Sequence, residues 1–251
     1  ATLKVPATKL RAVNMAIDHA LAAELGESEA VLRLYSWARP TVSFGRNEPV
    51  TGRYSRSEAS RRGVDYVRRP TGGRAVRHDA ELTYAVVAPA AALGGVRQAY
   101  RSINAALASA LADLGAPVAL AADNGTPSVD AGPCFQSPAG GEVTARGRKL
   151  VGSAQCRIEG ALLQHGSIIL AGDQGLLGRL TEGPVEEPDP PATLSEFLDV
   201  SSNSVVDAVV ESVQSQFGGS WEDAEYRPEE VETFERLARE RYATAEWTWR
   251  R

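Results

Sequence analysis

The residues of this chain best suited to nucleophilic chemistry are a cysteine and a lysine. Cys134 lies in residues 121–141, a stretch rich in glycine, proline and serine that has no helical or strand period. Long loops of this kind are often functional, and a cysteine becomes reactive when a nearby cation stabilises its thiolate. Lys149 follows a predicted hairpin turn at residues 146–147. We expect either a Cys134–Lys149 catalytic pair or an incidental loop cysteine.

The second cysteine, Cys156, is predicted to be structural. It ends the strand-like sequence KLVGSAQC, seven residues after Lys149. An odd separation on a regular strand places two side chains on opposite faces. If Lys149 faces a site, Cys156 faces the core, where a free cysteine behaves as a small hydrophobe.

A second candidate site is RRPTGGRAVRHD, residues 68–79. Gly72 and Gly73 suggest backbone that a ligand approaches closely, and the surrounding arginines suggest an anionic or strongly polar ligand. Residues 46–77 contain nine arginines against three acidic residues, a net charge of +6. This run is either a solvated surface, with Arg74 and Arg77 as ion-pair partners, or a docking surface for an acidic partner.

The three histidines are scattered, which argues against a metal site. His78 and His165 adjoin glycine-bearing turns or strand ends and are as consistent with a binding role as with a structural one. His19 lies in a helical run and is expected at the surface or partly buried. No glycine-rich phosphate or dinucleotide loop occurs.

Composition narrows the function classes. The 251 residues are 43% hydrophobic and 24% charged, as in a soluble globular protein, and no apolar run is long enough to span a bilayer. The N-terminus lacks the order of a signal peptide, and two cysteines are too few for a disulfide framework, so we expect a reducing cytoplasm. The net charge of −5 argues against general nucleic-acid binding.

The hydrophobic pattern predicts an α+β fold with a mixed, mainly antiparallel sheet flanked by helices. We expect one catalytic domain, residues 1–251, whose helical part 193–251 follows an acidic, proline-rich connector at 182–192. The predicted helices are 10–25, 55–63, 96–114, 203–217 and 227–242; the predicted strands are 31–37, 41–45, 64–69, 82–88, a hairpin over 142–156, and 161–170.

Two central motifs resemble those of the superfamily of lipoate–protein ligases, octanoyltransferases and biotin–protein ligases. RRPTGGRAVRHDAELTY is similar to the signature turn of that superfamily, and GRKLVGSAQ followed by LLQHGSIIL is similar to its second block. VNMAIDHAL, LYSWARPTVSFGRNE and ERYATAEWTWRR resemble its N-terminal helix, first strands and C-terminal helix. The resemblance covers nearly the whole chain and implies the class II ligase fold.

Three features favour the octanoyltransferase branch. Lipoate ligases usually carry a third glycine where this chain has Arg74, and they need an accessory domain, whereas this sequence stops near the end of the catalytic domain. GPCFQSP resembles the loop that carries the nucleophile in LipM-type octanoyltransferases. Ala139-Gly140-Gly141 departs from the aromatic residues of that branch.

The resemblance implies a ping-pong reaction without cofactor or metal. An octanoyl or lipoyl group would move from acyl carrier protein, through a thioester on Cys134, to a lysine of a lipoyl-domain protein such as the glycine cleavage H protein or a 2-oxoacid dehydrogenase E2 subunit. The catalytic residues would be Cys134 and Lys149. The implied substrate-binding residues are Arg69, Gly72, Gly73, Arg74, His78, Gly152, Ser153, Ala154 and His165.

Two alternatives remain. In an ATP-dependent lipoate–protein ligase, Lys149 would contact an acyl-adenylate and Cys134 would be incidental. A non-catalytic protein that binds acyl chains or lipoyl domains would keep the binding tunnel without turnover.

Overall fold

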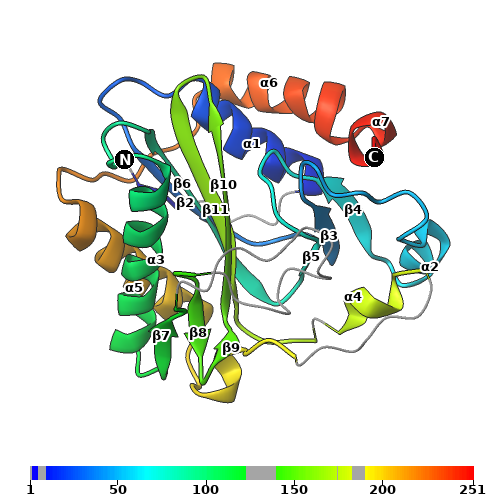
Figure 1. Ribbon diagram of the computed structural model, residues 1–251. Helices are drawn as coiled ribbons and strands as arrows, with labels where there is room; N and C mark the ends of the chain where they lie inside the picture. The colour runs from blue at the N-terminus through cyan, green and yellow to red at the C-terminus, as the bar shows by residue number, and fades with distance from the viewer. Residues whose placement is uncertain (1, 5–9, 123–139, 174, 183–189) are drawn as a thin grey trace.

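The computed structural model describes residues 2–4, 10–122, 140–173, 175–182 and 190–251 (Figure 1). The strands are β1 (Thr2–Lys4), β2 (Val31–Tyr35), β3 (Thr41–Phe44), β4 (Asp65–Arg68), β5 (Val76–His78), β6 (Glu81–Pro89), β7 (Val118–Leu120), β8 (Val143–Ala145), β9 (Arg148–Lys149), β10 (Val151–Ile158) and β11 (Ala161–Ile169). The helices are α1 (Arg11–Ala23), α2 (Arg56–Arg61), α3 (Val96–Asp113), α4 (Leu176–Arg179), the 3₁₀ turn η1 (Leu194–Glu196), α5 (Ser202–Phe217), α6 (Pro228–Leu237), its π-helical continuation η2 (Ala238–Tyr242) and α7 (Ala245–Thr248). None of the helices in the described part is long and apolar enough to cross a membrane.

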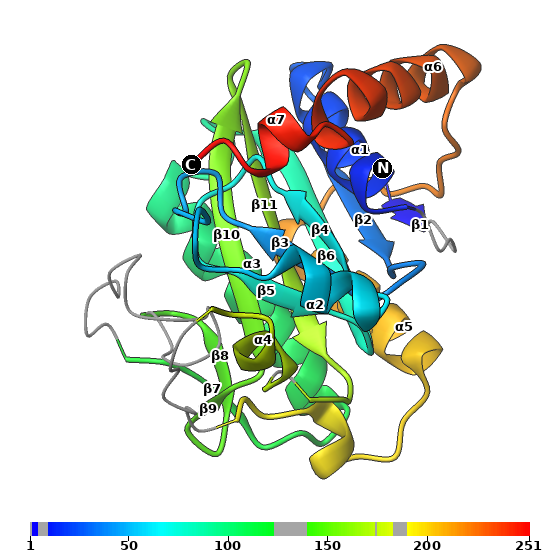
Figure 2. The same cartoon turned by 90° about the vertical axis from the view of Figure 1, so that its right-hand side faces the viewer.

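The strands form three sheets. The largest has the order β1-β2-β6-β11-β10, in which β1 runs parallel to β2 and the other neighbours are antiparallel. The second, β4-β3-β5, combines one parallel and one antiparallel pair, and the third, β7-β8-β9, is antiparallel (Figure 2). The prediction of a mixed, mainly antiparallel α+β fold is confirmed, with three sheets in place of one.

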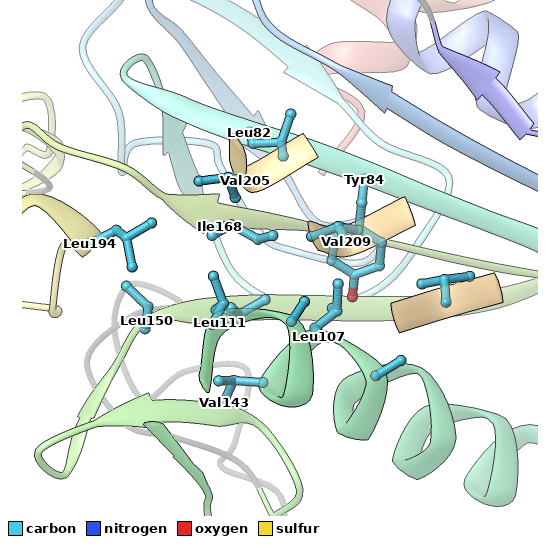
Figure 3. Packing of buried hydrophobic residues seen from close by; sticks show 14 of the residues in the cluster. Leu82, Tyr84, Leu107, Leu111, Val143, Leu150, Ile168, Leu194, Val205 and Val209 are labelled. Carbon is cyan, nitrogen blue, oxygen red and sulfur yellow. The ribbon is translucent and has the colours of Figure 1, made fainter. Parts of the chain in front are cut away.

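Strand β6 explains how helices cover both faces of the main sheet. Its side chains alternate between the two faces, so that Leu82, Tyr84 and Val86 join a cluster with α3 and α5 (Figure 3), whereas Ala85 and Val87 join a second cluster with α1 and α6. Both faces are buried, so β6 is a nearly continuous apolar run. Figure 1 shows α3 and α5 on one side of the sheet and α1 and α6 on the other.

The predicted hairpin differs from the observed structure at one residue. The turn lies where expected, with Arg146 and Gly147 at positive φ, as a two-residue hairpin turn requires. The following strand is not continuous, because Leu150 separates β9 from β10. The Leu150 N–H donates to Val143 of β8, and its carbonyl accepts from Ile169 of β11. The chain therefore crosses from one sheet to another at Leu150. Because Lys149 and Cys156 do not lie on one regular strand, the number of residues between them does not determine which faces their side chains occupy.

A buried polar network fastens α1 to the main sheet. The Asp18 carboxylate and the Arg33 guanidinium are both fully buried and lie 2.6 Å apart. Arg33 also donates to Asn14 Oδ1 at 2.7 Å, and the Tyr35 hydroxyl donates to Asp18 at 2.9 Å. Burial alone would raise the pKa of Asp18, but Arg33, His165 and Tyr35 together lower it. Asp18 and Arg33 are therefore both charged, and each has a further hydrogen-bond partner besides the other.

We predict that Arg33→Met destabilises the fold by about 3–5 kcal/mol, because it leaves the Asp18 carboxylate buried without its cation. Urea unfolding monitored by circular dichroism would measure this. Arg157→Met, which removes an exposed arginine of β10, is the matched control and should change stability by less than about 0.5 kcal/mol. Equal stability of the two variants would contradict a structural role for the pair.

Candidate active site

A cavity between the main sheet, α1 and the β4-β3-β5 sheet contains most of the residues that the sequence motifs predicted. The space enclosed in it is small, about 30 Å³. Met15, Tyr35, Trp37, Val76 and Ala154 give it apolar walls. Six of the predicted substrate-binding residues line it: Arg69, His78, Gly152, Ser153, Ala154 and His165. The two motifs, about 75 residues apart in sequence, therefore meet at one site.

The polar side of the cavity is arranged around the buried Glu81 carboxylate. Its Oε1 atom accepts hydrogen bonds from His78 Nδ1 at 2.7 Å, Thr83 Oγ1 at 2.6 Å and Ser167 Oγ at 2.8 Å. The other ring nitrogen of His78, Nε2, lies 2.7 Å from Ser43 Oγ. Most polar side chains in the cavity wall therefore form hydrogen bonds with one another.

Arg69 holds the glycine turn in place. Its guanidinium donates to the carbonyls of Gly72 and Arg74, at 2.9 and 2.7 Å, and to the carbonyl of Ser43 at 2.9 Å. Gly73 has φ +88°, and a Cβ there would lie 2.8 Å from Arg69 Nη2. At Gly72 a Cβ would meet nothing within 4 Å. Gly73 thus has a conformational reason to be glycine, while Gly72 faces open space.

His165 connects this turn to the buried network. Its Nδ1 lies 2.9 Å from Asp18 Oδ2, and its Nε2 lies 2.6 Å from Thr71 Oγ1. Burial lowers the pKa of His165 and outweighs the opposite effect of Asp18, so the ring is neutral near pH 7. The bond to Asp18 places the proton on Nδ1, and the Thr71 hydroxyl donates to Nε2.

Strands β10 and β11 approach unusually closely beside the cavity. A Cβ at Gly166 would lie 2.1 Å from the Gly152 carbonyl oxygen, so only glycine fits there. Ser153 Oγ is 2.6 Å from the Tyr84 hydroxyl and donates to Asn104 Oδ1 at 2.8 Å. The predicted Ser153 therefore bonds through its side chain to α3, and Gly152 and Ala154 are the residues that leave room in the cavity wall.

Lys149 lies beside residues 121 and 141–142, which flank the segment that contains Cys134. Its Nζ is 2.7 Å from Glu142 Oε1, and both side chains are buried. These flanking residues are joined to each other, because Ala121 N–H donates to the Glu142 carbonyl and Gly141 N–H donates to the Ala121 carbonyl. Cys134 itself lies outside the described residues, as do residues 123–139 as a whole.

Cys156 has the properties of a structural thiol. It packs against the cluster formed by α1, α6 and the main sheet. Burial raises the pKa of its thiol to about 11, although Arg46 acts in the opposite direction. The thiolate is therefore scarce at neutral pH.

The arginine run does not form one continuous surface. Arg68, Arg69, Arg74 and Arg77 are buried, and Arg68 donates to the carbonyls of Gly45, Glu48 and Thr248. The burial of these four corrects the solvated-surface reading of the whole run. Arg77 does form an ion pair, with the exposed Asp79 at 2.5 Å. Arg46, Arg53, Arg56, Arg61 and Arg62 are exposed.

Several site residues escaped the sequence analysis. Asp18 lies in an apolar helix and Arg33 in an apolar strand. Because buried charges are rare unless paired, these two positions could have indicated a buried ion pair. Glu81, Asn104 and Glu142 gave no signal, since their partners come from distant segments.

The chain was compared with known proteins. Residues 11–217 match the lipoyl protein ligase A/B catalytic domain. The octanoyltransferase LipM of Moorella thermoacetica is 44% identical over 164 residues, which cover 62% of this chain and 60% of that protein. The octanoyltransferase LipM of Kyrpidia tusciae is 37% identical over an alignment that covers 96% of this chain and 95% of its own.

Solved structures agree with the fold. A lipoate-protein ligase A bound with ATP superposes with a TM-score of 0.85 at 21% identity, covering 99% of this chain and 97% of its own. A bipartite lipoate protein ligase from Thermoplasma acidophilum gives 0.80 at 22% identity, covering 99% and 95%. At these identities the likeness establishes the fold alone. The family match and the full-length relatives establish more: the chain belongs to the lipoyl protein ligase A/B catalytic domain family.

Proposed function

We propose that this protein is an octanoyltransferase of protein lipoylation, which uses Cys134 as its nucleophile. The observation that carries the proposal is the 37% identity to an octanoyltransferase LipM over nearly the full length of both chains. In this proposal the acyl chain would lie between the apolar walls of the cavity beside the glycine turn. The donor would be octanoyl-acyl carrier protein, and the acceptors would be lipoyl-domain proteins in the cytoplasm.

The reaction proceeds by two acyl transfers. The Cys134 thiolate attacks the thioester carbonyl, a new carbon–sulfur bond forms, and the carrier thiol leaves. The ε-amine of the acceptor lysine then attacks the enzyme thioester, loses a proton and releases the cysteine, which leaves an octanoyl amide. Because the first exchange is between thioesters and the second gives a more stable amide, ATP is not required. Backbone N–H groups near Gly152–Ala154 would stabilise the oxyanion.

Lys149 has an electrostatic role in this scheme. It lies beside the residues that flank the segment containing Cys134, and it is three residues before the cavity-lining Gly152. A cation at this place favours the cysteine thiolate and polarises the reacting carbonyl. The structure also changes how the role must be tested, since Lys149→Ala alone would leave Glu142 buried beside a lost cation.

For Lys149 we predict that the double variant Lys149→Met/Glu142→Gln keeps the fold and lowers kcat about 100-fold, as loss of one transition-state partner does elsewhere. Glu142→Gln alone is the matched control and should retain most activity, because Lys149 remains. Steady-state transfer to a lipoyl domain measures both, with thermal unfolding to check the fold. Near wild-type turnover of a folded double variant would remove Lys149 from the mechanism.

For the cysteines we predict a covalent octanoyl adduct on Cys134, formed without ATP and released by hydroxylamine or by a lipoyl-domain lysine. Cys134→Ala should abolish both adduct and transfer, while Cys156→Ala should cost only about 1 kcal/mol of packing. Intact mass and peptide mapping after mixing with octanoyl-acyl carrier protein decide the matter. Transfer that appears only with ATP and free octanoate or lipoate would identify a ligase, and binding without any transfer would identify a non-catalytic binder.

For the glycine turn we predict that Gly72→Val lowers kcat/KM for octanoyl thioesters at least tenfold while sparing butanoyl thioesters. The new side chain enters open space beside the turn without straining the backbone. Gly73→Val is expected to impair every chain length, because φ +88° and the nearby Arg69 oppose any side chain. If Gly72→Val affects both substrates equally, the acyl chain does not pass this residue.

A further inference from the structure

Three arginines from separate segments gather beside the glycine turn. Arg46 follows β3, and its backbone N–H donates to the Thr71 carbonyl at 2.7 Å. Arg250 donates through Nη2 to the Arg46 carbonyl at 2.5 Å. The guanidiniums of Arg241 and Arg250 both lie over the ring of Trp247, at 3.8 and 3.9 Å from its centroid. Figures 1 and 2 show this C-terminal segment next to the chain that leaves β3. We call Arg46, Arg241 and Arg250 the arginine cluster.

Within the described part of the chain, the arginine cluster has no acidic partner. Among the described residues, none of its three members forms an ion pair, and Arg241 Nε is buried without a hydrogen-bond partner. Other arginines of the chain do have such partners, for example Arg11 with Asp65 at 2.7 Å and Arg227 with Glu230 at 3.0 Å. The stacking on Trp247 orders two of the guanidiniums, so part of the entropy of binding an anion is already lost.

The surrounding groups respond to this concentration of positive charge. Burial lowers the pKa of Arg250, and Arg46, Arg251 and Arg241 lower it further. Burial lowers the pKa of His19 to about 4, with Arg241 and Arg46 contributing. Like charges held together are unfavourable in the free protein, and an anion placed among them relieves that repulsion.

The position of the cluster selects the kind of anion. None of its three members lines the acyl cavity. The Arg46 backbone contacts the glycine turn, because the Arg46 N–H donates to Thr71 and Gly45 packs against Gly72 and Gly73. A thioester whose acyl chain entered the cavity would extend its other end toward this turn. Guanidinium groups match phosphate oxygens in geometry and charge. We propose, resting on the acyl transfer proposed above, that the arginine cluster binds the phosphate of the phosphopantetheine arm that carries the octanoyl group.

Binding of two inert analogues tests this proposal without requiring catalysis. In each, an NH group replaces the thioester sulfur; one is octanoyl-4′-phosphopantetheine amide and the other lacks the phosphate. Calorimetry should show the wild-type protein binding the phosphorylated analogue at least about tenfold more tightly, because charge-assisted hydrogen bonds of this kind are strong. Arg46→Gln/Arg250→Gln should abolish the difference and leave the affinity for the unphosphorylated analogue unchanged.

A matched control separates the cluster from general charge effects. Arg97→Gln/Arg236→Gln removes two arginines from α3 and α6, and it should keep the full preference for phosphate. Arg46→Gln alone, a change of an exposed side chain, should reduce the preference severalfold and guards against misfolding of the double variant. Equal affinity of the wild type for both analogues, absence of binding to either, or a preference that survives in the cluster variants would each overturn the proposal. Transfer from octanoyl-acyl carrier protein, assayed separately, reports on the proposed function itself.

Discussion

The Asp18 carboxylate is the interaction on which the site geometry depends. One oxygen receives Arg33 of β2, and the other receives both Tyr35 and His165 of β11. His165 in turn accepts from Thr71, the residue before the two glycines. A single buried anion thus relates a helix, two strands and the glycine turn by short hydrogen bonds. The separation of turn and sheet, and hence the width of the cavity, follows from it.

The polar residues of the signature motif hold the backbone around the glycine turn in place, in addition to any role in binding a ligand. Arg69 binds three backbone carbonyls around the turn, and the Glu48 carboxylate accepts the N–H groups of Gly45 and Ala75. Buried backbone groups need partners wherever the chain leaves regular structure. A turn that leaves one side open for a substrate must form its hydrogen bonds on the other side. Charged side chains suit this role because one such group can bond to several backbone groups at once.

The spacing of hydrophobic residues predicted the longer helices and strands well, because this spacing reflects which side chains are buried. The helices 10–25 and 96–114 and the strand 82–88 were predicted within a few residues of α1, α3 and β6. Short β5 was missed because three residues of a motif carry no period. The strand through Lys149 and Cys156 was predicted as continuous, since nothing local marks Leu150 as the residue that changes sheets. The buried fate of Arg68 and Arg69 was also invisible, because only tertiary partners make an arginine a core residue.

Arginine placement explains how an acidic protein can present an anion site. The chain has a net charge of −5, yet the field near a surface depends on charges within about a Debye length, roughly 8–10 Å at physiological salt. Arg33 is neutralised by Asp18, and Arg61 and Arg62 share the single carboxylate of Glu58, so pairing removes part of the positive charge of these arginines. The arginine cluster has no such partner among the described residues and adjoins the glycine turn. Its positive charge is therefore available to the anion that we propose for it, while acidic side chains elsewhere set the net charge.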